Sequence, residues 1–246
     1  MAPTRMRPFL EVISLAAARA VLDATGHPID RVEAVPLDQS NGRVLARDVI
    51  ARGDVPPFTR AAMDGYALRA SDTRGATRDK PRTLKRIGIL FTGQLSPVAV
   101  EDGECLEIST GAPMPDGADA VVMVEETASD NGAVRVFAEV QPQQNVGRRG
   151  ADIQAGQVVV SAGETLNSSR VGALAALGAS TVDVYQRPRA AILSTGNEIV
   201  EPGRPLGPGQ IYDINRFTIS AVVSDNGGVP VRYPPAPDAL DALIAA

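Results

Sequence analysis

The spacing of apolar residues predicts a helix near the N-terminus and short strands further along the chain. From Pro8 to Thr25 apolar side chains recur at helical spacing, and Gly26 is placed to end the element. This pattern predicts an amphipathic helix. Residues 35–51 then indicate a short strand, a turn and a second apolar element. The chain therefore begins with a mixed helix and strand region.

The pattern changes between residues 52 and 144, where short apolar runs alternate with glycine and proline. These runs cover residues 82–90, 104–109, 119–127 and 133–140. The Asp-Asn-Gly segment at 130–132 lies between two of them and indicates a two-residue hairpin turn. We therefore predict a small all-β insertion in this part of the chain.

Beyond the insertion the sequence predicts a helix at 167–178, capped by Asn167 or a serine and ended by Gly178, and then a strand at 180–188. From Arg189 onward the order is strand, helix, strand and helix, at residues 189–199, 215–228, 229–233 and 237–246. This order opens a parallel α/β sheet. Two strands bury too little core for a separate domain, so we expect the sequence to end inside one.

Composition narrows the function. The 246 residues carry a formal net charge of −5, which argues against a general nucleic-acid-binding protein. Cys105 and His27 are the only cysteine and histidine, which excludes an intrachain disulfide and a Cys/His zinc cluster. A metal here is expected to be a hard cation such as Mg²⁺, held by carboxylates and water. No apolar window is long enough to span a membrane, so we expect a cytoplasmic protein.

The segment "LSTGNEI" lies at the end of the first strand of the predicted parallel sheet, where open α/β sheets bind ligands. Ser194, Thr195 and Gly196 offer hydroxyl and N–H groups to an anion such as phosphate, and Glu198 is placed to hold a cation. The alternative is an ordinary turn with an exposed glutamate.

The segment "MDGYA" contains Asp64 followed by glycine. Asp-Gly is a common turn pair, because glycine accepts positive φ and aspartate bonds its own backbone. The functional alternative needs the Asp64 carboxylate to point into a cleft.

A second Ser-Thr-Gly, with Thr110 at its centre, precedes two prolines that stiffen its loop.

The segment "NVGRRGADI" places Arg148 and Arg149 close to Asp152. Paired arginines suit phosphate-like or molybdate-like oxyanions. A solvated basic turn explains the same residues equally well, so this segment alone decides nothing.

Taken together, these segments resemble the molybdopterin molybdenumtransferase family, the MoeA type that includes the gephyrin E domain. The resemblance covers essentially the whole chain from Pro8. It implies a Mg²⁺-dependent enzyme that inserts molybdate into adenylylated molybdopterin and releases AMP and molybdenum cofactor. By residue-to-residue match it implies Asp64, Thr110, Asp152 and Glu198 as the catalytic positions, with Asp64 and Glu198 on the metal.

The resemblance also implies an architecture and partners. The fold class is α+β and multidomain, with a mixed domain from residues 1–51 and 145–186, the all-β insertion at 52–144, and the first part of a three-layer α/β molybdopterin-binding domain at 187–246. The family is dimeric, so a homodimer is expected. Molybdopterin adenylyltransferase and molybdoenzyme acceptors are further expected partners.

The chain departs from the family pattern at four places. Residues 59–61 vary before the Asp64 motif, Gly147 replaces the usual first arginine of its segment, Asn197 replaces the first acidic residue of its turn, and Pro235 and Ala236 replace an aspartate pair. The alternatives to an enzyme are an inactive scaffold of the same fold and a molybdopterin carrier.

Overall fold

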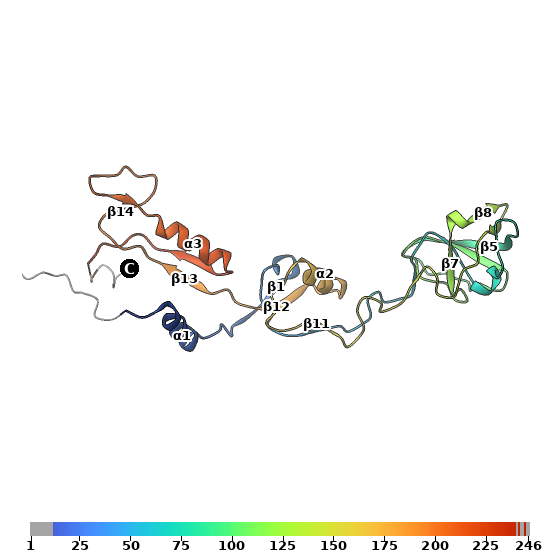
Figure 1. The fold of residues 1–246 in the computed structure, drawn as a ribbon, viewed down its shortest axis with the longest axis horizontal. Coiled ribbons are helices and arrows are strands. Elements are labelled where there is room, and N and C mark those ends of the chain that lie inside the picture. The colour runs from blue at the N-terminus through green and yellow to red at the C-terminus, as the bar shows by residue number, and fades with distance from the viewer. Residues whose placement is uncertain (1–11, 240, 242–243, 245–246) are drawn as a thin grey trace, which may run out of the picture. The chain divides into compact units, whose positions relative to one another are not determined.

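The computed structural model describes residues 12–239, 241 and 244. Two compact units can be separated by their internal contacts, and some of their elements are labelled in Figure 1. The first unit comprises Met1–Val35, Gly42–Ala46 and Asp183–Ala246, and the second comprises Pro36–Asn41 and Arg47–Val182. Each unit is described separately below.

Three α-helices and sixteen strands are assigned within the described residues. The helices are α1 (Leu15–Thr25), α2 (Ser168–Ala176) and α3 (Asn215–Asp225). The strands are β1 (Val32–Pro36), β2 (Val49–Ile50), β3 (Arg60–Ala61), β4 (Gly65–Leu68), β5 (Arg82–Leu90), β6 (Glu104–Ile108), β7 (Ala120–Met123), β8 (Thr127–Asp130), β9 (Ala133–Val136), β10 (Val146–Gly147), β11 (Val158–Val160), β12 (Thr181–Tyr185), β13 (Arg189–Ile192), β14 (Ile199–Val200), β15 (Ile211–Tyr212) and β16 (Val229–Arg232). The fold is α+β and multidomain, as the sequence predicts.

The first unit contains the expected start of a parallel α/β sheet. Strands β13 and β16 pair in parallel, with Arg189 opposite Val229, and α3 contacts both strands. The short strands β14 and β15 also pair in parallel. The helix predicted at 237–246 lies partly outside the described residues.

The second unit is dominated by a six-stranded sheet in the order β7-β4-β6-β5-β9-β8. Strand β4 pairs antiparallel with both neighbours, whereas β5 and β6 run parallel. Because side chains alternate across a strand, Tyr66 and Leu68 join one buried cluster and Ala67 joins another. The sheet therefore has an apolar core on each face.

Local signals in the sequence correspond closely to the structure. The hairpin between β8 and β9 turns through Asn131 and Gly132, at φ 47° and 81°, as the Asp-Asn-Gly segment predicts. The Asn167 side chain accepts a hydrogen bond from the Arg170 N–H and caps α2, and Gly178 follows α2 at φ 77°.

Two sequence-based expectations differ from the structure. Helix α1 begins at Leu15 with Ser14 as its cap, later than the start predicted at Pro8, which lies outside the described residues. Gly65 does not adopt a left-handed turn conformation: it is the first residue of β4, which the apolar pattern did not separate from a turn. The predicted domain boundaries remain predictions.

The described part of the chain includes no helix that is both long and apolar enough to cross a bilayer.

We expect Gly65→Ala to destabilise the second unit by about 3 kcal/mol or more. The added alanine Cβ would lie 1.9 Å from the Val122 carbonyl oxygen. Because this oxygen belongs to the backbone of β7, it cannot move without shifting the strand. Gly172→Ala is the matched control. Gly172 is a glycine within α2 whose added Cβ meets nothing within 4 Å, so this change is expected to stabilise the helix by about 0.5–1 kcal/mol. Denaturant unfolding of both variants checks the prediction, and equal stability would contradict it.

Candidate functional site

Asp64 is held at the start of a buried central strand. Gly65 lies opposite Ile108 of β6 and Met123 of β7, and the absence of a side chain lets the β7 backbone approach. The Asp64 carbonyl accepts a hydrogen bond from the Val124 N–H at 3.1 Å. Its carboxylate is exposed at the end of a rigid element, as a reactive or ligand-binding group requires.

Thr110 lies beside Asp64. The Thr110 N–H donates to Asp64 Oδ1 at 2.7 Å, and the next residue, Gly111, adopts φ 86° and donates its N–H to the Ala61 carbonyl at 2.8 Å. The chain thus bends directly after β6, and the exposed Thr110 side chain follows the same turn. The structure brings together two residues that are 46 positions apart in the sequence.

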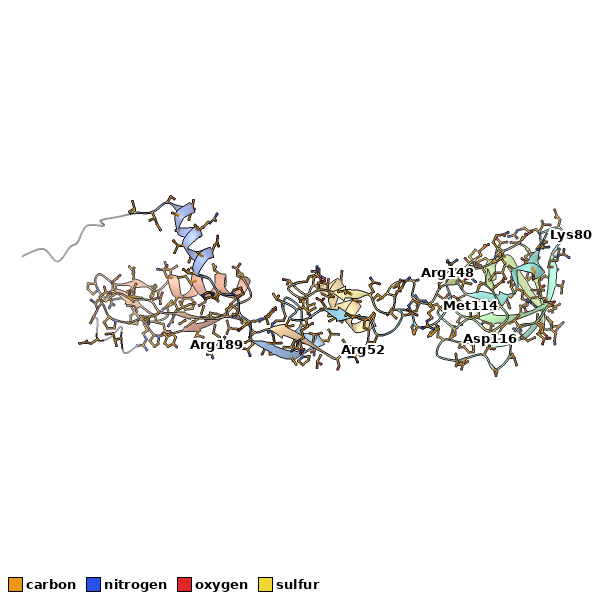
Figure 2. The ribbon with its side chains drawn as sticks, turned by 90° about the horizontal axis from the view of Figure 1, so that it is seen from below. Arg52, Lys80, Met114, Asp116, Arg148 and Arg189 are labelled. Carbon is orange, nitrogen blue, oxygen red and sulfur yellow. The ribbon has the colours of Figure 1, made fainter. Side chains whose placement is uncertain are left out.

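The loop after Thr110 returns across β3. Met114, labelled in Figure 2, donates its N–H to the Thr59 carbonyl at 2.9 Å. Strand β3 also pairs antiparallel with β10, so Gly147 lies opposite Arg60. A Cβ at Gly147 would lie 3.4 Å from Arg60 Cγ, which shows that the Arg60 side chain covers this glycine.

The two predicted arginines have different surroundings. Arg149 donates through Nε to Asp54 Oδ2 at 2.6 Å, so its charge is paired. Arg148, labelled in Figure 2, is exposed and has no ion-pair partner among the described residues. Asp152 lies in the same segment: its N–H donates to the Val55 carbonyl at 3.0 Å and its side chain is exposed.

Asp54 organises this segment, and the sequence analysis did not single it out. Its Oδ1 accepts the Ala155 N–H at 2.9 Å. This hydrogen bond, followed by the one from Arg149, lowers the pKa of the Asp54 carboxyl below its ordinary value. The Asp54 carboxylate therefore holds Arg149 and Ala155 close to each other in this loop.

Glu198 and the second predicted anion site belong to the first unit. The Ser194 hydroxyl donates to Asp213 Oδ1 at 2.9 Å, and the Gly196 N–H donates to the Ala236 carbonyl at 3.1 Å. Gly196 adopts φ 142°, and a Cβ there would lie 2.7 Å from Glu198 Oε2. The exposed Glu198 carboxylate therefore folds back over a position that accepts only glycine.

A pocket of about 330 Å³ opens beside this turn, lined partly by Ser194, Thr195, Asp213 and Asn215. Asp213 is almost completely buried at 2% exposure, and its Oδ1 also accepts the Arg216 N–H near the start of α3. Arg216 is 8% exposed and forms ion pairs with Glu201 and, at 3.7 Å, with Asp213 Oδ2.

The sequence analysis missed this buried network. An aspartate three residues before a backbone N–H that it caps is a recognisable N-cap signal, and the segment Asp213–Arg216 contains one. The Arg216 guanidinium, chiefly through its hydrogen bond, lowers the pKa of the Glu201 carboxyl.

Thiol chemistry does not fit the site. Cys105 is buried within β6, and burial raises the pKa of its thiol to about 12. It is therefore protonated at neutral pH and unsuited to nucleophilic attack. Within the described residues no three His, Cys, Asp or Glu side chains cluster closely enough to bind a metal ion by themselves.

The fold and these residues define an α+β protein that combines a six-stranded β insertion with carboxylates and hydroxyls at strand ends. The family model for the MoeA N-terminal region, domains I and II, matches residues 13–178. The chain belongs to this family.

Curated relatives support the assignment. Molybdopterin molybdenumtransferase 2 of Mycobacterium tuberculosis strain H37Rv is 39% identical over 204 residues, which is 83% of this chain and 50% of that protein. The Bacillus subtilis molybdopterin molybdenumtransferase is 34% identical over 218 residues, 87% of this chain and 51% of that protein. The chain therefore spans about half the length of the curated relatives it matches.

A solved structure has the same fold. The molybdopterin biosynthesis moeA protein of Pyrococcus horikoshii OT3 aligns with a TM-score of 0.87 and 33% identity, covering 96% of this chain and 64% of that one.

We predict that Arg149→Ala raises the pKa of Asp54, because the cationic donor is lost. The rise is partial, since the larger contribution, the Ala155 N–H, remains. Because the pKa of Asp54 in the folded chain lies below its ordinary value, the stabilisation from Asp54 is complete above its unfolded pKa and is lost as pH falls through the folded value. NMR titration of the Asp54 carboxyl carbon measures this pKa in each variant. Arg148→Ala is the control and should leave it unchanged; equal shifts in both variants would contradict the assignment.

Proposed function

We propose that this chain acts in molybdenum cofactor biosynthesis as the corresponding part of a molybdopterin molybdenumtransferase. In the proposed reaction molybdate enters the dithiolene of adenylylated molybdopterin, and AMP and molybdenum cofactor are released. Family membership and the names of the relatives support this proposal.

The observation that carries the proposal is the pairing of Asp64 with Thr110. Gly65 fixes the start of β4, Asp64 Oδ1 accepts the Thr110 N–H at 2.7 Å, and both side chains are exposed. A carboxylate that is anchored through one oxygen keeps its other oxygen available for a ligand. This arrangement suits a preorganised site rather than a solvated turn.

Asp64 in the second unit and Glu198 in the first unit each present an exposed carboxylate, the kind of hard oxygen ligand that Mg²⁺ prefers together with water. When bound, the ion supplies positive charge that offsets the charges of molybdate and phosphate.

The remaining predicted residues bind and orient the substrates. Thr110 contributes its hydroxyl to an oxyanion, and the exposed Arg148 contributes a guanidinium without a competing carboxylate among the described residues. Asp152 adds a carboxylate to the loop that contains Arg148 and Arg149. Arg149 acts through Asp54, which holds the loop in position.

The proposal includes a homodimer in the cytoplasm that receives its substrate from a molybdopterin adenylyltransferase and passes its product to molybdoenzymes. Helix α1 supports the dimer: it buries none of its residues, and Leu15 and Leu22 are 72% and 68% exposed. Exposed large apolar side chains on one helix suit burial in an assembly.

A second candidate is an inactive scaffold or molybdopterin-binding module on the same fold. Ala236, in the segment where the resemblance leads us to expect aspartates, is 5% exposed and is held by its backbone against Ser194 and Gly196. A carboxylate is therefore lacking at this point next to the turn.

We expect Asp64→Asn and Glu198→Gln each to lower molybdenum insertion by at least about 100-fold, because each removes a carboxylate ligand of the proposed magnesium ion. The test supplies the chain to cells that lack the insertion step and measures maturation of a molybdoenzyme. It is run with and without a polypeptide carrying the half of the relatives that this chain does not match.

Asp79→Asn, which alters an exposed carboxylate elsewhere on the second unit, is the matched control and should retain activity. Normal maturation with the Asp64 or Glu198 variant would show that the site is wrongly assigned. Absence of maturation with the unchanged chain, both with and without the second polypeptide, would favour the scaffold.

A further inference from the structure

One edge of the six-stranded sheet is open to pairing with another strand. Within the described residues, β8, labelled in Figure 1, pairs with β9 alone. The opposite edge strand, β7, is covered: the Val121 N–H donates to the Gln144 carbonyl at 3.1 Å, and the Val121 carbonyl accepts from the Asn145 side chain at 2.9 Å. An uncovered edge strand can accept a strand of another molecule.

The register of β8 shows which of its backbone groups point outward. The Phe137 N–H donates to the Glu126 carbonyl at 2.9 Å, immediately before β8. Because the direction of these groups alternates along an antiparallel pair, Ala128 is the next residue to bond to β9, and Ser129 turns its N–H and its carbonyl away from the sheet. No hydrogen bond joins either Ser129 group to another described residue. Ser129 therefore offers one donor and one acceptor at the open edge.

The side chains of β8 leave this edge accessible. The strand consists of threonine, alanine, serine and aspartate, and it contains no lysine or proline, which often protect an edge strand. Ser129 and Asp130 are exposed. Asp130 carries the only charge of the strand, and it has no ion-pair partner among the described residues.

The neighbouring strand supplies a charge of the opposite sign. Arg135 of β9 lies opposite Ala128, so it shares a face of the sheet with Asp130. The Arg135 side chain is exposed, lies 5.9 Å from the centre of the Phe137 ring, and has no carboxylate partner in the described part of the chain. One unpaired anion and one unpaired cation are therefore present on the same face of this edge.

Two copies of this edge complement each other. In an antiparallel pair centred on Ser129, this residue lies opposite its counterpart, and each N–H donates to the carbonyl of the other copy. Asp130 of one copy then lies opposite Ala128 of the other, with Arg135 one strand further on. The two charged side chains start about 10 Å apart, which is two strand spacings. The small Ala128 side chain between them lets the arginine reach across.

We propose that β8 pairs antiparallel with β8 of a second copy of this chain, through reciprocal Ser129 hydrogen bonds and two Asp130–Arg135 ion pairs. The contact joins two six-stranded sheets into one. It uses a different surface from the homodimer proposed through α1 and does not depend on the proposed function. None of the exposed large apolar side chains belongs to β8 or β9, so the contact is small and polar and the association is weak and reversible.

The first test is sedimentation of the full chain over a concentration series that reaches about 1 mM, the range of weak contacts. We expect a species that contains one more association step than the Ser129→Pro variant shows. Proline removes the outward N–H of Ser129 and is tolerated on an edge strand at such a position. Loss of the two reciprocal hydrogen bonds is expected to weaken this step about tenfold or more.

A charge exchange tests the ion pairs. Asp130→Arg and Arg135→Asp are each expected to weaken the association about threefold or more, because the symmetric contact loses two ion pairs and gains like charges. The double variant Asp130→Arg/Arg135→Asp restores the opposite charges and is expected to restore the association. Asp116→Arg, at an exposed aspartate that Figure 2 labels elsewhere on the second unit, is the matched control and should leave it unchanged. Circular dichroism checks the folding of each variant.

Three results would overturn the proposal. The first is an unchanged chain that associates no further than Ser129→Pro, since any remaining association then belongs to another surface. The second is a double variant that stays as weak as the single variants. The third is binding of a fluorescent polyglutamate peptide at β8 by a chain that does not self-associate, which would assign the edge to a strand of a different protein.

Discussion

The close approach of two backbones at Gly65 is the constraint on which the second unit depends. With no Cβ in the way, the Val122 carbonyl lies where a side chain would begin, and β4 can enter the sheet between β6 and β7. All four β4 residues are buried, and their alternate side chains enter two separate cores. Asp64 takes its position from this packing, since the residue before a fixed strand has little freedom of its own.

The sequence predicted well those features that short segments determine by themselves. Asn131 and Gly132 suit left-handed backbone conformations, and Asn167 is a good helix cap wherever it precedes a helix. The role of Gly65 was not accessible in this way. Asp-Gly is typical of turns, and only contact with a strand 57 residues further on, at Val122, shows that the glycine is needed for packing.

The candidate site shows the same contrast between features that short segments determine and features that depend on distant contacts. The motifs identified exposed carboxylates and hydroxyls, but the partners of each group lie far away in the sequence. Arg149 is paired with Asp54, and Ser194 donates to Asp213. Residue type therefore predicts which groups can bind a ligand, whereas the tertiary contacts decide which donors remain available.

The two Ser-Thr-Gly turns make this point directly, since the same tripeptide serves two arrangements. At residues 109–111 the backbone N–H of threonine donates to Asp64, and the threonine side chain stays exposed. At residues 194–196 the serine hydroxyl and the glycine N–H are both donors to other parts of the chain. An anchoring aspartate is common to both turns, but it engages a backbone group in one and a side chain in the other. Both turns thus keep an exposed threonine side chain, whereas the Ser194 hydroxyl of the second turn is already engaged with Asp213.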